Sequence, residues 1–139
     1  MSDTSRPNVT AYLCAKGASD AIAFYTKAFG AREAYRLPND DGTLGHAEIR
    51  IGETTLYLSD EAPQLNVLSP TTRGGATCSF VLDVDDVDAA FARAVDAGAT
   101  VERPIVDNPY GRSGWVIDPF GHRWSIMTPN PNFDPKDMQ

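Results

Sequence analysis

The sequence has few of the residues that mark several common protein classes. It contains two cysteines and two histidines among 139 residues, too few cysteines for a disulfide framework. Its 12 Lys and Arg residues stand against 19 Asp and Glu, a net charge of -7. This balance argues against nucleic acid as a partner, because duplex binding needs cationic side chains that neutralise phosphates. No apolar run approaches the roughly 18 residues that a membrane-spanning helix needs.

What remains is typical of a soluble globular protein, with 42% hydrophobic and 22% charged residues. We expect one domain over residues 1–139. The first residues form no apolar signal segment, so we expect a cytoplasmic protein that does not bind membranes. Cys14 and Cys78 are expected to be buried free thiols.

One order of strands and helix occurs twice in the chain. Each copy has an apolar strand, a helix closed by Gly-Ala and three further strands, over about residues 8–60 and 77–128. The two Gly-Ala closures lie about 68 residues apart, at Gly30 and Gly98. Residues 61–76 are rich in Pro and Gly and predict a linker, and residues 129–139 predict a peripheral tail. Two copies of this order indicate a pseudo-symmetric fold with a ligand cleft.

Alternation and capping residues define the elements of each copy. A strand is expected over residues 9–14, with Val9 and Leu13 facing the core. Ser19 or Asp20 is expected to cap the first helix. The acidic run over residues 83–88 has the chemistry of a metal site, but capping of the second helix explains most of it.

Three segments carry a resemblance to a known family. They are residues 21–31 (AIAFYTKAFGA), residues 84–90 with the later Ala-Gly-Ala, and residues 117–124 (IDPFGHRW). In this order the chain resembles the vicinal oxygen chelate superfamily, which includes glyoxalases, bleomycin-resistance proteins and extradiol dioxygenases. The resemblance implies an α+β fold in which two βαβββ modules form a cupped mixed sheet. The bleomycin-resistance type implies a homodimer that binds a small molecule between protomers.

The family's enzymes hold a divalent metal with side chains from the first and last strands of each module. Carried over by position, these sites fall on Thr10, Tyr57, Ser79 and Ser125. A catalytic divalent site needs about three anionic or imidazole donors, and these residues supply none. We therefore expect no metal and no other cofactor, with a divalent metal as the alternative.

The alternation of side chains along the strands predicts which residues line the concave face of the cupped sheet. If Ile49, Ile51, Leu56 and Leu58 lie under the helix, the opposite face carries His46, Glu48, Arg50 and Tyr57. His46 and Glu48 are candidate catalytic residues, as an acid-base pair, although a solvated strand face explains them equally. Trp115 is a candidate for stacking on a planar ligand. The full set of expected ligand-binding residues is Tyr12, His46, Glu48, Arg50, Tyr57, Ser79, Trp115 and Ser125.

The sequence therefore predicts a metal-independent, dimeric protein that binds an aromatic or antibiotic-like small molecule. The alternative is an enzyme of the same superfamily, a lyase, isomerase or dioxygenase with a relocated metal site or the His46 and Glu48 pair. Whether the chain is an enzyme stays open at this point, because a fold does not fix a function.

Overall fold

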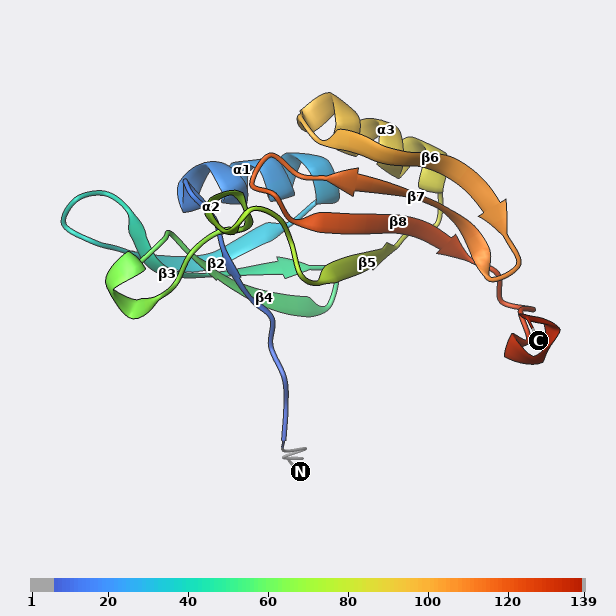
Figure 1. Cartoon of the computed structure of the whole chain (residues 1–139), viewed down its shortest axis with the longest axis horizontal. Coiled ribbons are helices and arrows are strands. Elements are labelled where there is room, and N and C mark those ends of the chain that lie inside the picture. Colours follow the sequence, from blue (N-terminus) through green and yellow to red (C-terminus); the bar gives the residue numbers. More distant parts are fainter. Residues whose placement is uncertain (1–6, 139) are drawn as a thin grey trace.

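The repeat seen in the sequence is a repeat of structure. The computed structural model describes residues 7–138, and Figure 1 shows its two halves side by side. The first module contains β1 (Tyr12–Cys14), α1 (Ala18–Phe29), β2 (Arg32–Pro38), β3 (Leu44–Ile51) and β4 (Thr54–Ser59). The second contains β5 (Ser79–Asp83), α3 (Val87–Ala97), β6 (Thr100–Asn108), β7 (Gly111–Ile117) and β8 (Arg123–Pro129).

Each module has its own four-stranded mixed sheet. The strand orders are β1-β4-β3-β2 and β5-β8-β7-β6, so the two sheets repeat one topology. In each, the first strand runs parallel to the last, as β1 does to β4 and β5 to β8, and the remaining pairs are antiparallel. The α+β fold of two βαβββ modules is thus confirmed, with one sheet per module in the single chain.

The helices cover one face of each sheet and leave the other face open. In Figure 1 both α1 and α3 lie on the same side of the sheets. On β3 the buried residues are Leu44, Ala47 and Ile49, and on β4 Leu56 and Leu58 are buried with them. This alternation is the signature of a sheet with one face against a hydrophobic core.

Backbone donors at the start of α1 are satisfied from a distant strand end. The expected cap by Ser19 or Asp20 is wrong, because α1 begins after Gly17 with no side-chain cap of its own. Instead Asp60 Oδ1 accepts hydrogen bonds from the N–H groups of Gly17 and Ala18, at 2.9 and 3.0 Å. The carboxylate thereby links the helix to the end of β4.

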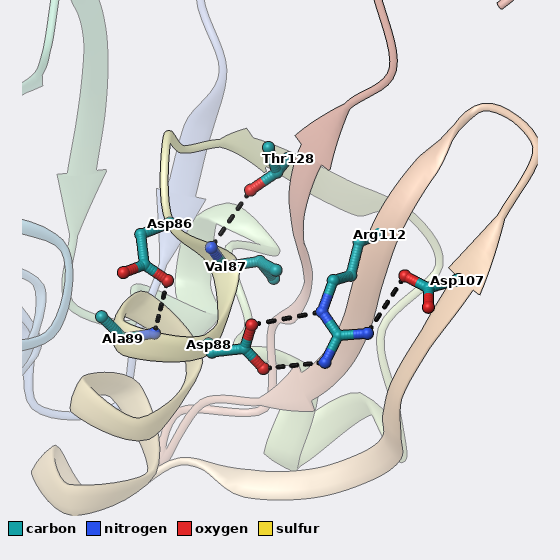
Figure 2. A network of polar contacts seen from close by, with 7 residues as sticks. All are labelled: Asp86, Val87, Asp88, Ala89, Asp107, Arg112 and Thr128. Carbon is teal, nitrogen blue, oxygen red and sulfur yellow. Dashed lines mark hydrogen bonds and ion pairs between the residues drawn. The ribbon is translucent and has the colours of Figure 1, made fainter.

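At the second helix the expected acidic cap is present. Asp86 Oδ1 accepts from the Ala89 N–H, and the Val87 N–H donates to Thr128 Oγ1 (Figure 2). Asp88 forms an ion pair with Arg112 on β7 at 2.9 Å. The acidic run therefore has a structural role at the start of α3.

Three local expectations are corrected. The first strand begins at Tyr12, and Val9 is 98% exposed and does not face the core, whereas Ala11 packs against it. The linker contains two short helices, a 3₁₀ turn η1 (Pro63–Leu65) and α2 (Pro70–Arg73), and the tail contains η2 (Pro135–Met138). Cys78 is exposed and lies just before β5, whereas Cys14 is partly buried in β1, and both are free thiols.

Candidate ligand-binding site

Strand pairing places two of the predicted tyrosines and the predicted carboxylate in one row. Tyr12 on β1 is the register partner of Tyr57 on β4, which in turn faces Glu48 on β3. Register partners project from the same face of a sheet. Because Ala47 and Ile49 are buried on the helix side, this row lies on the open face.

His46 sits among three tyrosine rings on that face. Its ring centroid lies 5.3 Å from Tyr12, 5.8 Å from Tyr35 and 5.0 Å from Tyr57. Tyr12 and Tyr57 also meet edge to face at 5.5 Å, a favoured geometry for aromatic pairs. We refer to Tyr12, Tyr35, His46 and Tyr57 as the tyrosine-histidine cluster.

A hydrogen bond of 2.6 Å joins the Tyr12 hydroxyl to His46 Nδ1. Burial of the phenol raises the pKa of Tyr12, and the nearby Tyr35 and Tyr57 raise it further. The hydroxyl therefore stays protonated at neutral pH, and it donates to Nδ1 in the tautomer that carries the ring proton on Nε2. His46 Nε2 is then the ring nitrogen left to contact a ligand.

The proposed acid-base pair has a different geometry from the one expected. His46 and Glu48 lie two apart on β3, on one face, but within residues 7–138 no hydrogen bond joins them. The hydrogen-bonding partner of His46 is Tyr12. Arg50 follows on the same face and is exposed, and the described chain gives no ion pair to either Glu48 or Arg50.

The second module carries a different set of side chains on its open face. The Arg123 guanidinium lies 4.3 Å from the ring centroid of Trp115, and that of Arg103 lies 5.8 Å from it. Both distances are within the range of a cation-π contact. We refer to Arg103, Trp115 and Arg123 as the tryptophan-arginine cluster.

Polar partners hold Arg123 against the tryptophan. Arg123 forms an ion pair with Glu102 at 2.5 Å and donates to Ser79 Oγ at 2.6 Å. The Glu102 pKa is lowered mainly by its hydrogen bonds from Arg123, and the charge of Arg103 adds to this. Ser125, the register partner of Trp115, is only 4% exposed, so it forms the floor of this face.

The eight predicted site residues thus form two groups. Tyr12, His46, Glu48, Arg50 and Tyr57 come together on the first sheet, and Ser79, Trp115 and Ser125 come together on the second. Within residues 7–138 no side-chain hydrogen bond, ion pair or ring contact joins a residue of one group to a residue of the other.

The sequence reasoning missed Tyr35, Arg103 and Arg123. Each lies on an open face beside a predicted residue. Cross-strand pairing of β2 with β3 and of β6 with β7 would have identified the first two, but a register shift in each pair hides the alternation.

A cleft of about 610 Å³ lies elsewhere, between the two modules on the helix side. Its walls include Phe29, Leu56, Phe80 and Trp124. None of the eight predicted site residues lines it. Val81 and Asp83 of β5 do line it, so the cleft borders the open face of the second sheet.

The family's metal positions hold residues that do not fit a metal. Thr10 precedes β1 and is exposed, and Tyr57, Ser79 and Ser125 are neutral oxygen ligands. Over residues 7–138 no group of three or more His, Cys, Asp and Glu side chains converges. His46 and Glu48 offer two donors on one strand, fewer than a catalytic divalent site uses.

Comparison with known proteins identifies the family. The model of the Glyoxalase/Bleomycin resistance protein/Dioxygenase superfamily matches residues 7–126. The chain belongs to this superfamily. An uncharacterized protein of Mycobacterium bovis is 44% identical over 133 residues, which span 93% of this chain and 88% of that protein.

Two further proteins that are similar to this chain have names that state a role. The anthracycline biosynthesis protein DnrV of Streptomyces peucetius is 28% identical over 117 residues, covering 83% of this chain and 38% of DnrV. The fosfomycin resistance protein FosX of Listeria monocytogenes, crystallised as a variant with Mn(II) and 1S,2S-dihydroxypropylphosphonic acid, superposes with a TM-score of 0.74. At 16% identity over 98% of this chain and 100% of FosX, this likeness shows the shared fold.

Within residues 7–138 the superfamily member has no helix that is long and apolar enough to cross a bilayer.

Proposed function

We propose that this protein binds an aromatic, antibiotic-like small molecule without the help of a metal. The observation that carries the proposal is the tyrosine-histidine cluster, which presents three tyrosine rings around one imidazole on an open sheet face. Aromatic side chains give a large contact area at a small cost in conformational entropy. The neutral residues at the family's metal positions accord with binding that is independent of a metal.

Exposed apolar side chains on the open faces favour a homodimer of the bleomycin-resistance type. Tyr12 is 55% exposed, Leu37 57% and Val81 58%. Soluble monomers seldom leave contiguous apolar surface in water, and a second protomer would cover part of it. In such a dimer the ligand would lie between an open face of one protomer and an open face of the other. We further propose that the dimer is cytoplasmic.

The names of two relatives agree with a small-molecule ligand. DnrV is named for anthracycline biosynthesis and FosX for fosfomycin resistance. Both names concern antibiotics, and an anthracycline is polycyclic and aromatic. A ligand of that kind would suit the rings of the two clusters.

A thermal-shift screen tests the proposal. Purified protein would be heated with anthracyclines and other polycyclic aromatic antibiotics, each with and without a chelator. A ligand at 100 times its dissociation constant should stabilise the fold by about 2.7 kcal/mol. Equal stabilisation in chelator supports metal-independent binding, and loss of stabilisation in chelator contradicts it.

Substitutions on the open faces test whether the ligand binds there. Tyr57→Ala and Trp115→Ala should each weaken the affinity about 2- to 12-fold, since stacking on one ring contributes about 0.5–1.5 kcal/mol. Tyr110→Ala is the matched control, because Tyr110 contacts Phe133 of the tail. Sedimentation measurements on the same samples report whether the protein is a dimer.

The second candidate function is a metal-free isomerase. It is favoured by the hydrogen bond from Tyr12 to His46 Nδ1, which leaves the ring proton on Nε2, so that Nε2–H can act as a general acid with Glu48 beside it as the general base. An isomerase would lose turnover in His46→Gln while it retained substrate binding. A pure binding protein would show no turnover in either form.

A further inference from the structure

Positive charge is concentrated on the open faces of an otherwise acidic protein. The whole chain has a net charge of -7. The strands place four arginines on the open faces against three carboxylates, a local balance of +1. The arginines are Arg32, Arg50, Arg103 and Arg123, and the carboxylates are Glu48, Asp83 and Glu102.

One of these four arginines is paired within the chain, since Arg123 binds Glu102 and Ser79. Arg50 and Arg103, like Arg32, take part in no ion pair within the part of the chain that the structure describes, residues 7–138. A guanidinium presents donors in a planar fork that matches a carboxylate. Each of these two residues can therefore receive an anionic group from outside the chain.

Arg103 lies beside an aromatic ring, and Arg50 lies one register position from one on the same sheet face. Arg103 is 5.8 Å from the centre of the Trp115 ring. Arg50 pairs with Thr55, which is two residues from Tyr57 on the same face of β4, a spacing of about 7 Å along a strand. An aromatic ring and a cation at this separation complement a ligand that carries a ring and an acidic group.

We propose that the ligand is an aromatic acid, an inference that rests on the proposed function. Its rings contact the tyrosine-histidine and tryptophan-arginine clusters, and its anionic group binds Arg50 or Arg103. A cationic ligand would instead meet two arginines beside the rings, with Glu48 as the one carboxylate next to the tyrosines. The charge on these faces thus selects an acid over an amine of the same shape.

Three probes of one shape separate these possibilities. They are 2-naphthoate, 2-naphthalenemethanol and 2-naphthylmethylammonium, which share a ring and differ in charge. Calorimetric titration at about pH 8, where the carboxylate and the ammonium probes both carry their charges, should show the naphthoate binding about tenfold tighter than the alcohol. The ammonium should bind most weakly, and added salt should reduce the difference.

Arginine variants locate the anion site. Arg50→Gln and Arg103→Gln should weaken naphthoate binding, with about a tenfold loss at the residue that contacts the acid, and leave the alcohol unchanged. Arg103→Lys and Arg50→Lys, which keep the charge, should restore part of the loss. Arg36→Gln is the control, because Arg36 contacts Ser19 of α1 on the covered face of the same sheet, and it should change nothing.

The outcomes distinguish a failure of the preference for an acid from a failure of the proposed binding function. Equal binding of the three probes, or tightest binding of the ammonium, overturns the preference for an acid and leaves aromatic binding intact. Unchanged naphthoate affinity in both glutamine variants overturns the assignment of the anion site. If none of the probes binds and the antibiotic screen is also negative, the binding function itself fails, and the acid preference fails with it.

Discussion

The hydroxyl of Tyr25 on α1 donates a 2.5 Å hydrogen bond to Asp118 Oδ2, which lies 93 residues later in the turn before β8. Both residues are buried. The same oxygen accepts from Trp124 Nε1 at 2.9 Å, and Oδ1 accepts from the N–H groups of Phe120 and His122. Asp118 is therefore a fully bonded buried carboxylate that connects the two modules.

Removal of the tyrosine hydroxyl should loosen this connection. Tyr25→Phe keeps the ring, which packs against Phe29 and Trp124, but takes one donor from a buried charge. We expect the free energy of unfolding to fall by about 1.5–3 kcal/mol, the range for a hydrogen bond to a charged group. Chemical denaturation monitored by circular dichroism measures it.

Tyr110→Phe is the matched control for that change. Tyr110 is 40% exposed, and we expect its loss of a hydroxyl to alter stability by less than about 0.5 kcal/mol. Equal effects of the two substitutions would show that the bond between Tyr25 and Asp118 contributes nothing specific.

Glu61 should make the linker sensitive to acid. Its carboxylate accepts hydrogen bonds from the Thr72 hydroxyl and from the N–H and hydroxyl of Ser69. These bonds, that of Thr72 foremost, lower the pKa of Glu61 from 4.5 to about 2. A carboxyl whose pKa is depressed in the folded state stabilises the fold above its unfolded pKa. This contribution should be complete above about pH 4.5 and disappear as the pH falls toward 2.

Stability measured as a function of pH for Glu61→Gln tests this expectation. The variant should be less stable than the parent at pH 7, and the difference should narrow between about pH 4.5 and pH 2. Glu53→Gln, in the turn between β3 and β4, serves as the control, and its difference from the parent should stay small. A constant difference for Glu61→Gln across this range would contradict the role of ionised Glu61.

The sequence predicted the elements that depend on local chemistry. Gly30 does end α1 in a left-handed conformation, with φ of 72°, as a Gly-Ala closure indicates. Alternation along β3 and β4 correctly assigned Ile49, Leu56 and Leu58 to the core, and so placed His46 and Glu48 on the open face. These inferences needed only the period of a strand and the freedom of a glycine.

Contacts between distant segments could not be predicted in this way. Alternation tells which face a residue occupies, but it does not tell which strand lies beside it. The hydrogen bond from Tyr12 to His46, 34 residues apart, depends on β1 pairing with β4 and β4 with β3. The contact of Arg123 with Trp115 likewise requires the register of β7 on β8. The bond of Asp118 to Tyr25 arises from the packing of the two modules.

The two cysteines should differ in reactivity. Burial raises the pKa of the Cys14 thiol to about 11, and the charges of Glu61 and Asp60 add to this. The thiolate is the reactive form, so Cys14 should be inert at neutral pH, whereas Cys78 is exposed. A thiol reagent at about pH 7.5 should modify one cysteine quickly in the folded protein and two after denaturation. Cys78→Ser should abolish the fast reaction and Cys14→Ser should preserve it; fast labelling of Cys78→Ser would contradict the assignment.

Gly114 on β7 should tolerate no side chain, because α3 lies directly above it. A Cβ at this position would lie 2.6 Å from Phe91 Cε2 and 3.0 Å from Ile105 Cγ1, much closer than carbon atoms approach in a packed core. Gly114→Ala should therefore lower the free energy of unfolding by about 1–3 kcal/mol, the usual cost of overpacking. Gly45→Ala on β3 is the control, since the nearest atom there is Asn39 Oδ1, on an exposed side chain that can move. Thermal unfolding of both variants measures the difference, and an unchanged or raised midpoint for Gly114→Ala would mean that α3 does not pack on β7 at this distance.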